Sequence, residues 1–431
     1  MKILFVVPYT PNVIRVRPYE FVRALLQAGH AVTLAAIWTT EAEQADLERL
    51  RVQGARVLAE PIAGWHSAMN SLSALPSRTP LQAVYSWQPR LLDRIIEVLS
   101  QERFDAIHVE HLRGSRYALE LKKYLATKTD RPPIVWDSVD CISYLFEQAA
   151  QNSRSWKSKL LTRFELGRTR RFEARLVEAF DRTLVTSVID KQALVDLVRQ
   201  QRLADDGHRD TSRLRSAEDA IAVVPNGVDL AHFGYRDGAA RPANRVIFSG
   251  KLSYHANVTA ALHLVNDIMP QVWQQRPDTE VWLVGKDPAP EVRVLDTDNG
   301  NGADVTGRRV VVTGAVPDMC EYLQTSTVAV APLLYGAGIQ NKVLEALACG
   351  TPVVASPQAV AALAQNSAGE FVVADSNVEF ADAIVRLLAS PARRAELGIA
   401  GHAYVNQHYS WQRAALQLET IYRSCEPPHP L

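Results

Sequence analysis

Short apolar runs alternate with amphipathic segments along nearly the whole chain. In the first half we interpret five such runs as buried strands: Ile3–Val7, Ala31–Ile37, Ala106–Val109, Ile134–Trp136 and Thr183–Thr186. Between them, apolar residues recur at helical spacing in Tyr19–Ala28, Leu91–Leu99 and Ser115–Leu125. A parallel strand must be followed by a crossover segment, usually a helix, before the next strand can begin. The alternation therefore predicts an α/β fold in which helices cover a parallel sheet.

The same alternation begins again in the second half of the chain. We expect its strands at Val246–Ser249, Glu280–Val284, Val310–Thr313, Val328–Leu333 and Pro352–Ala355. Its helices include Val258–Trp273 and Ile339–Cys349. A Pro-Asn-Gly turn in the segment VVPNGVDLAHF separates the two series. In a chain of 431 residues this predicts two domains, 1–225 and 226–408, followed by a C-terminal helix within 409–425.

Charge and cysteine content exclude several classes of protein. Basic and acidic residues number 47 each, so the net charge of zero gives no reason to expect nucleic acid as a partner. The four cysteines form no CxxC pair, which argues against a zinc site and a disulfide framework. The apolar run after Met1 is too short for a signal peptide, and no run of about 18 apolar residues predicts a membrane span. We therefore expect a cytoplasmic protein.

The strongest chemical signal is the segment GAGIQNKVLEALACGTPVVAS, residues 336–356. It predicts a glycine turn after a strand, a helix that opens at Ile339 and ends at Gly350, and a further strand. A helix N-terminus at the carboxyl end of a parallel strand is a phosphate site. Helical spacing places Gly338, Asn341, Lys342 and Glu345 on one side. A lysine in a first turn opposes the helix dipole unless an anion binds there, and a glutamate one turn later can accept two hydrogen bonds from a ribose diol.

The same spacing also fits an ordinary amphipathic helix with a solvated Lys-Glu pair. A nicotinamide dinucleotide fingerprint is disfavoured, because Asn341 occupies its third glycine position and no acidic residue follows about 20 positions later. No GxxxxGK[ST] motif is present. The pattern Asp296-Thr297-Asp298 lies in a polar, glycine-rich loop, where DxD arises easily by chance, so we predict no metal site.

The segment 336–356 resembles the donor-site helix of glycosyltransferase family four, the retaining enzymes with a GT-B fold. More narrowly, it is similar to the sugar transferases that accompany bacterial exopolysaccharide and protein-sorting gene clusters. Further similarity lies in PYTPNVIRVRPYEFVRALLQAGHAVTL, VWDSVD, VVPNGVD, FSGKLSYHANVTAALHLVNDIMP, VWLVG, VVVTGAVPD, FVVADSNVEFADAIVRLL and HYSWQRAALQLETIY. The resemblance implies two facing Rossmann-like domains with parallel sheets and an interdomain cleft. It also implies an acceptor-side first domain, a donor-binding second domain, and a final helix that packs back on the first.

Carried over by resemblance, the donor site comprises Gly250, Lys251, Gly338, Ile339, Gln340, Asn341, Lys342 and Glu345. Lys251 would be catalytic, and with Lys342 it would stabilise charge on the leaving diphosphate, a role that a metal fills in other transferases. Alternatively, Lys251 is a surface lysine in a turn.

In the first domain, the resemblance implies catalytic contacts from Asp137 and His111 at strand ends. Arg15 and Arg17, in the loop after the first strand, and Asp140 would line the acceptor side. The plainer interpretations are a solvated loop for the arginines, a helix cap for Asp140, and a core position for His108.

Three departures from the family pattern stand out. Ala337 occupies the position of a family glutamate, Asn12–Arg17 lacks a glycine pair, and Glu110 occupies the expected position of a histidine.

We therefore expect transfer of a sugar from a nucleoside diphosphate sugar to a hydroxyl acceptor, with retention and without a further cofactor. The acceptor would be a glycan, a lipid-linked molecule or a small molecule, in polysaccharide, glycolipid or related glycoconjugate biosynthesis. The alternatives are another GT-B enzyme, such as a sugar-nucleotide epimerase, or a non-catalytic sugar-nucleotide-binding protein.

The segment 154–175 carries eight basic and two acidic residues, with Trp156, Leu160, Leu161 and Phe164 at helical spacing. It predicts either peripheral contact with the inner face of an anionic membrane or an ordinary helix with a solvated basic side.

Overall fold

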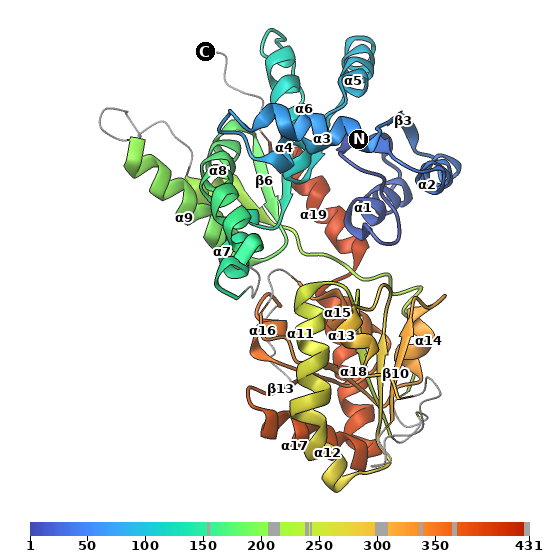
Figure 1. Cartoon of the computed structure of the whole chain (residues 1–431). Helices are drawn as coiled ribbons and strands as arrows, with labels where there is room; N and C mark the ends of the chain where they lie inside the picture. The colour runs from blue at the N-terminus through green and yellow to red at the C-terminus, as the bar shows by residue number, and fades with distance from the viewer. Residues whose placement is uncertain are drawn as a thin grey trace. The chain divides into compact units, whose positions relative to one another are not determined.

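The computed structural model describes residues 1–152, 156–205, 216–237, 241, 244–297, 309–335, 339–363 and 369–425; for 149–152, 156–163 and 205 it describes only the backbone. The chain divides into two compact units, drawn in Figure 1. The first unit comprises Met1–Pro225 together with Trp411–Leu431, and the second comprises Asn226–Ser410. Each unit is described by itself below.

The first unit is built on a seven-stranded sheet with the order β3-β2-β1-β4-β5-β6-β7. All neighbouring strands pair in parallel. The strands are β1 (Lys2–Val7), β2 (Ala31–Trp38), β3 (Arg56–Pro61), β4 (Ala106–Glu110), β5 (Ile134–Val139), β6 (Arg182–Val185) and β7 (Ile221–Val223). β1 is central, and five of its six residues are buried, since helices cover both faces of the sheet.

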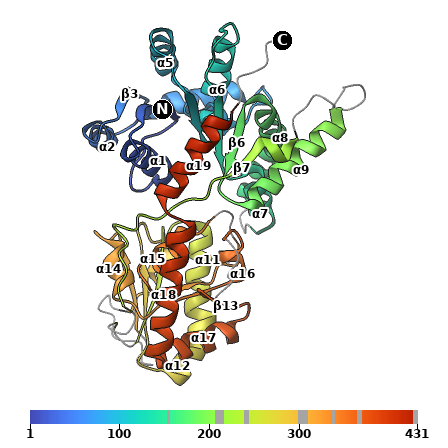
Figure 2. The ribbon, with the colours of Figure 1, turned by 180° about the vertical axis from the view of Figure 1, so that it is seen from behind.

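Helices follow most of these strands as crossovers. They are α1 (Val16–Gln27), α2 (Glu41–Val52), α3 (Gly64–Ala74), α4 (Leu81–Tyr85), α5 (Pro89–Gln101), α6 (His111–Leu125), α7 (Ile142–Asn152), α8 (Trp156–Ala179), α9 (Val188–Asp205) and α10 (Ala217–Ala220). The C-terminal helix α19 (Trp411–Ser424) lies beside α1, as Figure 2 shows from behind. The rings of Trp411 and Phe21 meet edge to face at 5.4 Å, so α19 belongs to the core on this side of the sheet.

The second unit has a six-stranded parallel sheet with the order β10-β9-β8-β11-β12-β13. Its strands are β8 (Arg245–Ser249), β9 (Glu280–Val284), β10 (Arg309–Gly314), β11 (Val328–Ala331), β12 (Val353–Ala355) and β13 (Val372–Val373). The chain adds β9 and β10 on one side of β8, and then β11, β12 and β13 on the other. The order thus reverses between β8 and β11, the place where open α/β sheets bind ligands at the carboxyl ends of their strands.

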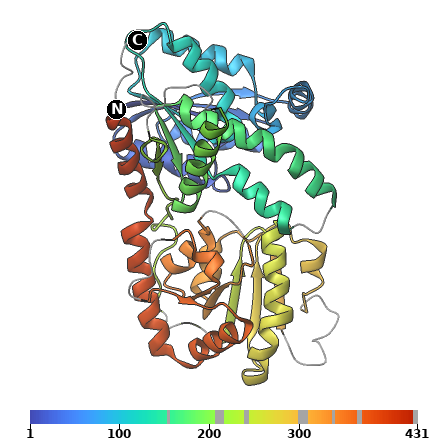
Figure 3. The same cartoon turned by 90° about the vertical axis from the view of Figure 1, so that its left-hand side faces the viewer.

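The helices of the second unit form layers on the two faces of its sheet. They are α11 (His255–His263), the π-helical turn η3 (Leu264–Ile268), α12 (Met269–Gln275), α13 (Pro290–Arg293), α14 (Met319–Gln324), α15 (Asn341–Ala348), α16 (Pro357–Val360), α17 (Asn377–Ala389) and α18 (Pro391–His408). Figure 3 shows the sheet between α11, in yellow, and α18, in red. A single apolar core joins sheet and helices.

The predicted α/β fold class with parallel sheets is confirmed. Two local expectations were wrong. Arg17 does not lie in the loop after the first strand, because α1 already begins at Val16. The donor-site helix begins at Asn341 and not at Ile339, because Gln340 has the extended backbone of an N-cap residue.

Candidate functional site

Bare backbone lines the carboxyl edge of the second sheet. Gly250, Gly285 and Gly314 follow or end three neighbouring strands, β8, β9 and β10, and have φ values of 138°, 155° and 69°. A Cβ atom on Gly285 would lie 1.7 Å from the carbonyl oxygen of Gly250, so only glycine fits there. On Gly250, a Cβ atom would lie 3.2 Å from Nζ of Lys342. The glycines therefore let the sheet edge come close to the side chain of Lys342.

Asn257 connects this edge to α15. Its Nδ2 donates a hydrogen bond of 2.9 Å to the carbonyl oxygen of Lys251, and its Oδ1 accepts a hydrogen bond from Nζ of Lys342. The ammonium group of Lys342 also lies 4.4 Å from the centroid of the Phe248 ring at the end of β8. β8, α11 and α15 thus fix a cation at the switch point of the sheet.

Burial sets the charge state of this site. It lowers the pKa of Lys342 to about 7, against a smaller opposing effect of Glu345. It raises the pKa of Glu345 to about 7, which Lys342 only partly offsets. Among the described residues, the buried Oδ1 of Asn341 has no hydrogen-bond partner. Buried polar groups usually find partners, so this arrangement suits a ligand with anionic groups and hydroxyls.

The N-terminus of α15 adds to the positive character of the site. Its first turn contains no acidic residue, and Lys342 stands there instead. Ile339 and Gln340 lead into the helix. Gly338, expected beside them, and Ala337 lie outside the described residues. Free backbone N–H groups and the helix dipole favour an anion at such an end.

Lys251 differs from Lys342 in its surroundings. Its side chain is exposed, and its Nζ lies 3.9 Å from Oδ2 of Asp287, in the turn after β9. The two lysines share Asn257 as a hydrogen-bond partner, one through its backbone oxygen and one through its side chain. The sequence therefore places two cations on one edge, a buried one with a shifted pKa and an exposed one.

In the first unit, Arg17 and Asp137 form a buried ion pair. Nε and Nη2 of Arg17 donate to the two carboxylate oxygens at 2.8 and 3.2 Å, and Nη1 donates to the carbonyl oxygen of Val224 at 3.0 Å. Burial would raise the pKa of Asp137, but Arg17 and the nearby His108 hold it well below its usual range. The expectation of a loop arginine facing the acceptor is therefore wrong in position: Arg17 ties α1 to the ends of β5 and β7.

His108 is a core residue, as its alternation with buried neighbours indicated. Its ring stacks on Phe5 at 4.0 Å, and its Nδ1 lies 2.8 Å from the hydroxyl of Tyr422 on α19. Its Nε2 lies 3.5 Å from Oδ2 of Asp137. Burial lowers the pKa of His108.

The carboxyl ends of β4 and β5 are strained. His111 and Val139 have φ values of 63° and 69°, a conformation that costs free energy for residues other than glycine and is frequent at functional sites. Burial lowers the pKa of His111 to about 4, so its imidazole is neutral at pH 7. Burial and Asp190 raise the pKa of Asp140 to about 7. Of these two residues, only Asp140 has a pKa close to neutral pH.

Glu110 was singled out from the sequence only as a departure from the family pattern, without a role. Burial and the charge of Asp137 raise its pKa to about 8, and the hydroxyl of Tyr9 donates to its Oε1 at 2.7 Å. A protonated carboxyl group at the end of β4 is a proton donor at neutral pH. Its place at the expected position of the family histidine was the signal in the sequence.

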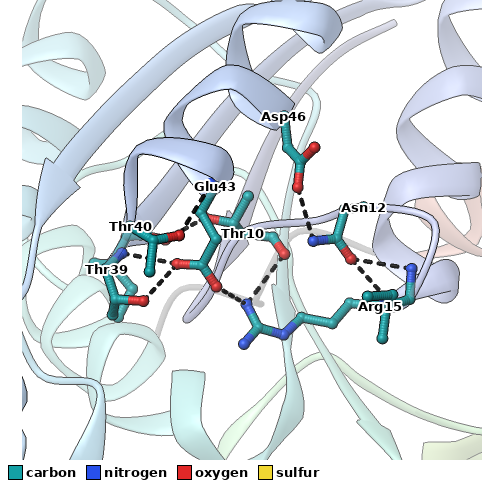
Figure 4. Close-up of polar contacts among 9 residues, drawn as sticks. Thr10, Asn12, Arg15, Thr39, Thr40, Glu43 and Asp46 are labelled. Atoms are coloured by element: carbon teal, nitrogen blue, oxygen red, sulfur yellow. Dashed lines mark hydrogen bonds and ion pairs between the residues drawn. The ribbon is translucent and has the colours of Figure 1, made fainter. Parts of the chain in front are cut away.

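Contacts with its own loop and with α2 hold Arg15 in place, as Figure 4 shows. Its Nη1 lies 3.0 Å from Oε1 of Glu43 on α2 and 3.3 Å from the carbonyl oxygen of Thr10. Asn12 fixes the same loop, since its Nδ2 donates to Asp46 at 2.9 Å and its Oδ1 accepts from the backbone of Arg15 at 3.0 Å. The side chain of Arg15 is thus partly exposed and fixed by an ion pair with Glu43 and a hydrogen bond to Thr10.

Within the described ranges, no group of three or more His, Cys, Asp and Glu residues is arranged to hold a metal ion. Asp298 of the DxD pattern lies outside those ranges. Among the helices that the structure describes, none is both long and apolar enough to cross a bilayer.

Comparison with known sequences finds glycosyltransferases among the relatives of this chain. Residues 243–390 match the family described as Glycosyl transferases group 1. A GDP-mannose-dependent monoacylated alpha-(1-6)-phosphatidylinositol monomannoside mannosyltransferase of Corynebacterium glutamicum is 32% identical over 164 residues, 36% of this chain and 42% of the relative. A phosphatidyl-myo-inositol mannosyltransferase of Mycolicibacterium smegmatis is 26% identical over 291 residues, 66% of this chain and 68% of the relative. A D-inositol 3-phosphate glycosyltransferase of Nocardiopsis dassonvillei is 28% identical over 255 residues, 54% of this chain and 58% of the relative.

Solved structures share the fold over the whole chain. Anabaena HepE in complex with UDP and glucose has a TM-score of 0.62 at 15% identity, covering 98% of this chain and 100% of that one. Sucrose-phosphate synthase from Thermosynechococcus elongatus has a TM-score of 0.61 at 17% identity, covering 98% of each chain. The chain thus has the GT-B fold. Family match, relatives and structures together support a GT-B glycosyltransferase.

Proposed function

We propose that this chain transfers a hexose from a nucleoside diphosphate sugar to a hydroxyl acceptor, with retention of configuration. The observation that carries the proposal is the pair Lys342 and Glu345 at the reversal point of the second sheet, inside the region that matches the group 1 glycosyltransferases. A buried cation beside bare glycine backbone suits a diphosphate, and a carboxylate one helical turn away suits a ribose diol.

The second unit would bind the donor. Its diphosphate would lie between Gly250 and the N-terminus of α15, where Lys342 and Lys251 take up the charge that develops on the leaving group. Glu345 would accept hydrogen bonds from the ribose hydroxyls. The fixed positions of Asn257 and Phe248 support this assignment, because they hold Lys342 in place before the ligand arrives.

The first unit would present the acceptor. His111 and Asp140 lie at the carboxyl ends of its strands, and Glu110 extends this group. We propose that Asp137, whose carboxylate Arg17 already neutralises, positions its neighbours and does not itself move a proton. Because the names of relatives include phosphatidyl-myo-inositol mannosyltransferases, we propose a lipid-linked hydroxyl as the acceptor. We therefore propose a role in glycolipid or polysaccharide biosynthesis, on the cytoplasmic side of a membrane.

The test is a calorimetric screen of nucleoside diphosphates and their sugar conjugates, followed by a nucleotide-release assay with and without lipid extracts. We expect saturable binding of at least one sugar nucleotide, and release of its nucleotide only when an acceptor is present. Nucleotide release without an acceptor-dependent product would instead indicate an epimerase. Binding without turnover under any acceptor would indicate a sugar-nucleotide-binding protein.

A further inference from the structure

Helix α3 is packed with its apolar side outward. Trp65, Met69 and Leu72 are 60%, 59% and 63% exposed, and Leu75, just after the helix, is 44% exposed. The buried residues of the helix are small: Ser67 and Ala74 are each 4% exposed. The exposed residues follow one another at intervals of four, three and three, so they form one stripe of about 15 Å. We call these four residues the α3 stripe.

Polar contacts fix this orientation. Nδ2 of Asn70 donates to the carbonyl oxygen of Trp87 at 3.0 Å, and the hydroxyl of Ser71 donates to the backbone of Ser67 at 3.0 Å. The first contact ties the polar side of α3 to the unit, and the second lies within the helix itself. Helix α3 lies on the face turned toward the viewer in Figure 1. Four exposed large apolar side chains in one row are unusual for a soluble surface and mark a contact site.

The charge around the stripe is positive. Residues 61–92 contain no Asp or Glu, while Arg78 follows the stripe directly. Helix α8 lies next to it, since Nη2 of Arg168 donates to the carbonyl oxygen of Leu75 at 2.6 Å. The same guanidinium group lies 4.2 Å from the ring of Phe164, which is 48% exposed.

The two acidic residues of the segment 154–175 are buried, and Oε1 of Glu165 lies 3.7 Å from Nη1 of Arg168, so Glu165 pairs with that arginine. Oε2 of Glu165 accepts from the backbone of Leu81 at 2.9 Å. Glu173 is buried and accepts from the backbone of Ile142 and Ser143 at 2.8 and 3.1 Å. Because Arg168 is paired, the exposed positive charge beside the stripe comes from Arg78, in a stretch of the chain without acidic residues.

We propose that the α3 stripe, together with Phe164 and Arg78, docks on an anionic lipid bilayer. Trp, Met and Leu side chains beside arginines suit the boundary between headgroups and acyl chains, where the rings and aliphatic groups insert and the cations meet lipid phosphates. A second copy of the same surface would bring like charges together, which disfavours a symmetric dimer. Docking goes beyond the proposed transfer reaction, since it requires neither donor nor turnover.

This surface differs from the one that the sequence indicated. The segment 154–175 was expected to use Trp156, Leu160 and Leu161, whose side chains lie outside the described residues. Most of the apolar contribution now comes from α3, and the exposed cation is Arg78, both earlier in the chain than this segment. Contacts between Arg168 and Leu75 join the two helices in one surface.

The test is co-sedimentation of the full chain with vesicles of phosphatidylcholine alone or mixed with phosphatidylglycerol. We expect binding only to the mixed vesicles, weaker at high salt. The variant Trp65→Ser/Met69→Ser/Leu72→Ser should bind about tenfold or more weakly. Its control, Val52→Ser/Leu203→Ser/Leu416→Ser, replaces three similarly exposed apolar side chains elsewhere in the unit and should bind like the wild type. Arg78→Glu should weaken binding to mixed vesicles about fivefold or more.

Two controls separate docking from the donor site and from folding. Nucleotide affinity of the stripe variant should equal that of the wild type, because the donor residues belong to the other unit. Its melting temperature should be unchanged, since the replaced side chains already face solvent. Equal sedimentation of the stripe variant and the wild type would overturn the proposal. So would wild-type protein that ignores anionic vesicles, and light scattering that shows a dimer dissociated by the stripe substitutions would assign the surface to self-association instead.

Discussion

At the residue scale, Lys342 is the side chain whose removal tests the donor site most directly. We expect Lys342→Ala and Glu345→Ala each to weaken nucleotide binding by about 1.5–3 kcal/mol, because each variant lacks one charged side chain that would form a hydrogen bond with the ligand. Calorimetric titration measures this loss. Both variants should remain folded, although each leaves its partner buried without the opposite charge and so lowers the free energy of unfolding. Lys128→Ala, at an exposed lysine of the first unit, is the control. Unchanged affinity in both site variants would remove the basis of the donor assignment.

The same two residues predict how binding depends on pH. Lys342 loses its charge as the pH rises through about 7, so its attraction for a diphosphate falls above that value. Glu345 becomes protonated as the pH falls through about 7, so its capacity to accept two hydroxyl hydrogen bonds falls below that value. Nucleotide affinity should therefore peak near pH 7.

Calorimetry over roughly two pH units on either side measures the two slopes. Lys342→Met should abolish the decrease on the alkaline side, and Glu345→Gln should abolish the decrease on the acid side. If the wild type and both variants respond to pH in the same way, other groups control the titration.

At the element scale, the glycine edge predicts a steric effect. Gly285→Ala should destabilise the protein by about 1–3 kcal/mol and weaken donor binding, because the new Cβ atom collides with the backbone of Gly250 and the φ value is unfavourable. Gly167→Ala in helix α8 is the matched control, since no described atom lies within 4 Å of its Cβ position. The control should be neutral or slightly stabilising, as expected for alanine in a helix. Chemical denaturation compares the two, and equal stability would show that the edge adapts to a methyl group.

The strands and helices also show how much of the secondary structure local sequence patterns can predict. Central strands such as β1 and β8 were predicted because they are continuous apolar runs buried on both faces. Strands β3, β7 and β13 were not predicted, because they lie at the edges of the sheets and are short or contain polar residues. The helix predicted at residues 258–273 contains the π-turn η3, whose extra residue hardly disturbs helical spacing.

The residues of the candidate site also differ in whether local sequence patterns can predict them. Lys342 and Glu345 are one helical turn apart, so the sequence alone could group them. Arg17 and Asp137 are 120 positions apart, and no local sequence pattern predicts their ion pair. The raised pKa of Glu110 likewise depends on burial that only the assembled sheet creates.

At the scale of the whole molecule, the two units have separate cores. Trp411→Ala should destabilise the first unit by about 3–5 kcal/mol, because it empties a buried site against Phe21. Hydrogen exchange should then show faster exchange in β1 and β4, while β8 and β11 and the nucleotide affinity stay unchanged. Leu416→Ala, at an exposed position of the same helix, should have little effect. Loss of protection in both units would show that they unfold together.

The discontinuity of the first unit also has a consequence for synthesis. Residues up to Pro225 leave the ribosome first, yet part of the cover on one face of their sheet comes from Trp411–Ser424. At about 5–20 residues per second, the nascent chain waits roughly 10 to 40 seconds while the second unit is made. During that interval Phe5, Phe21 and their apolar neighbours lack their final cover. The second unit is contiguous, so it can complete its fold first, and the earliest part of the chain to be translated is the last to be finished.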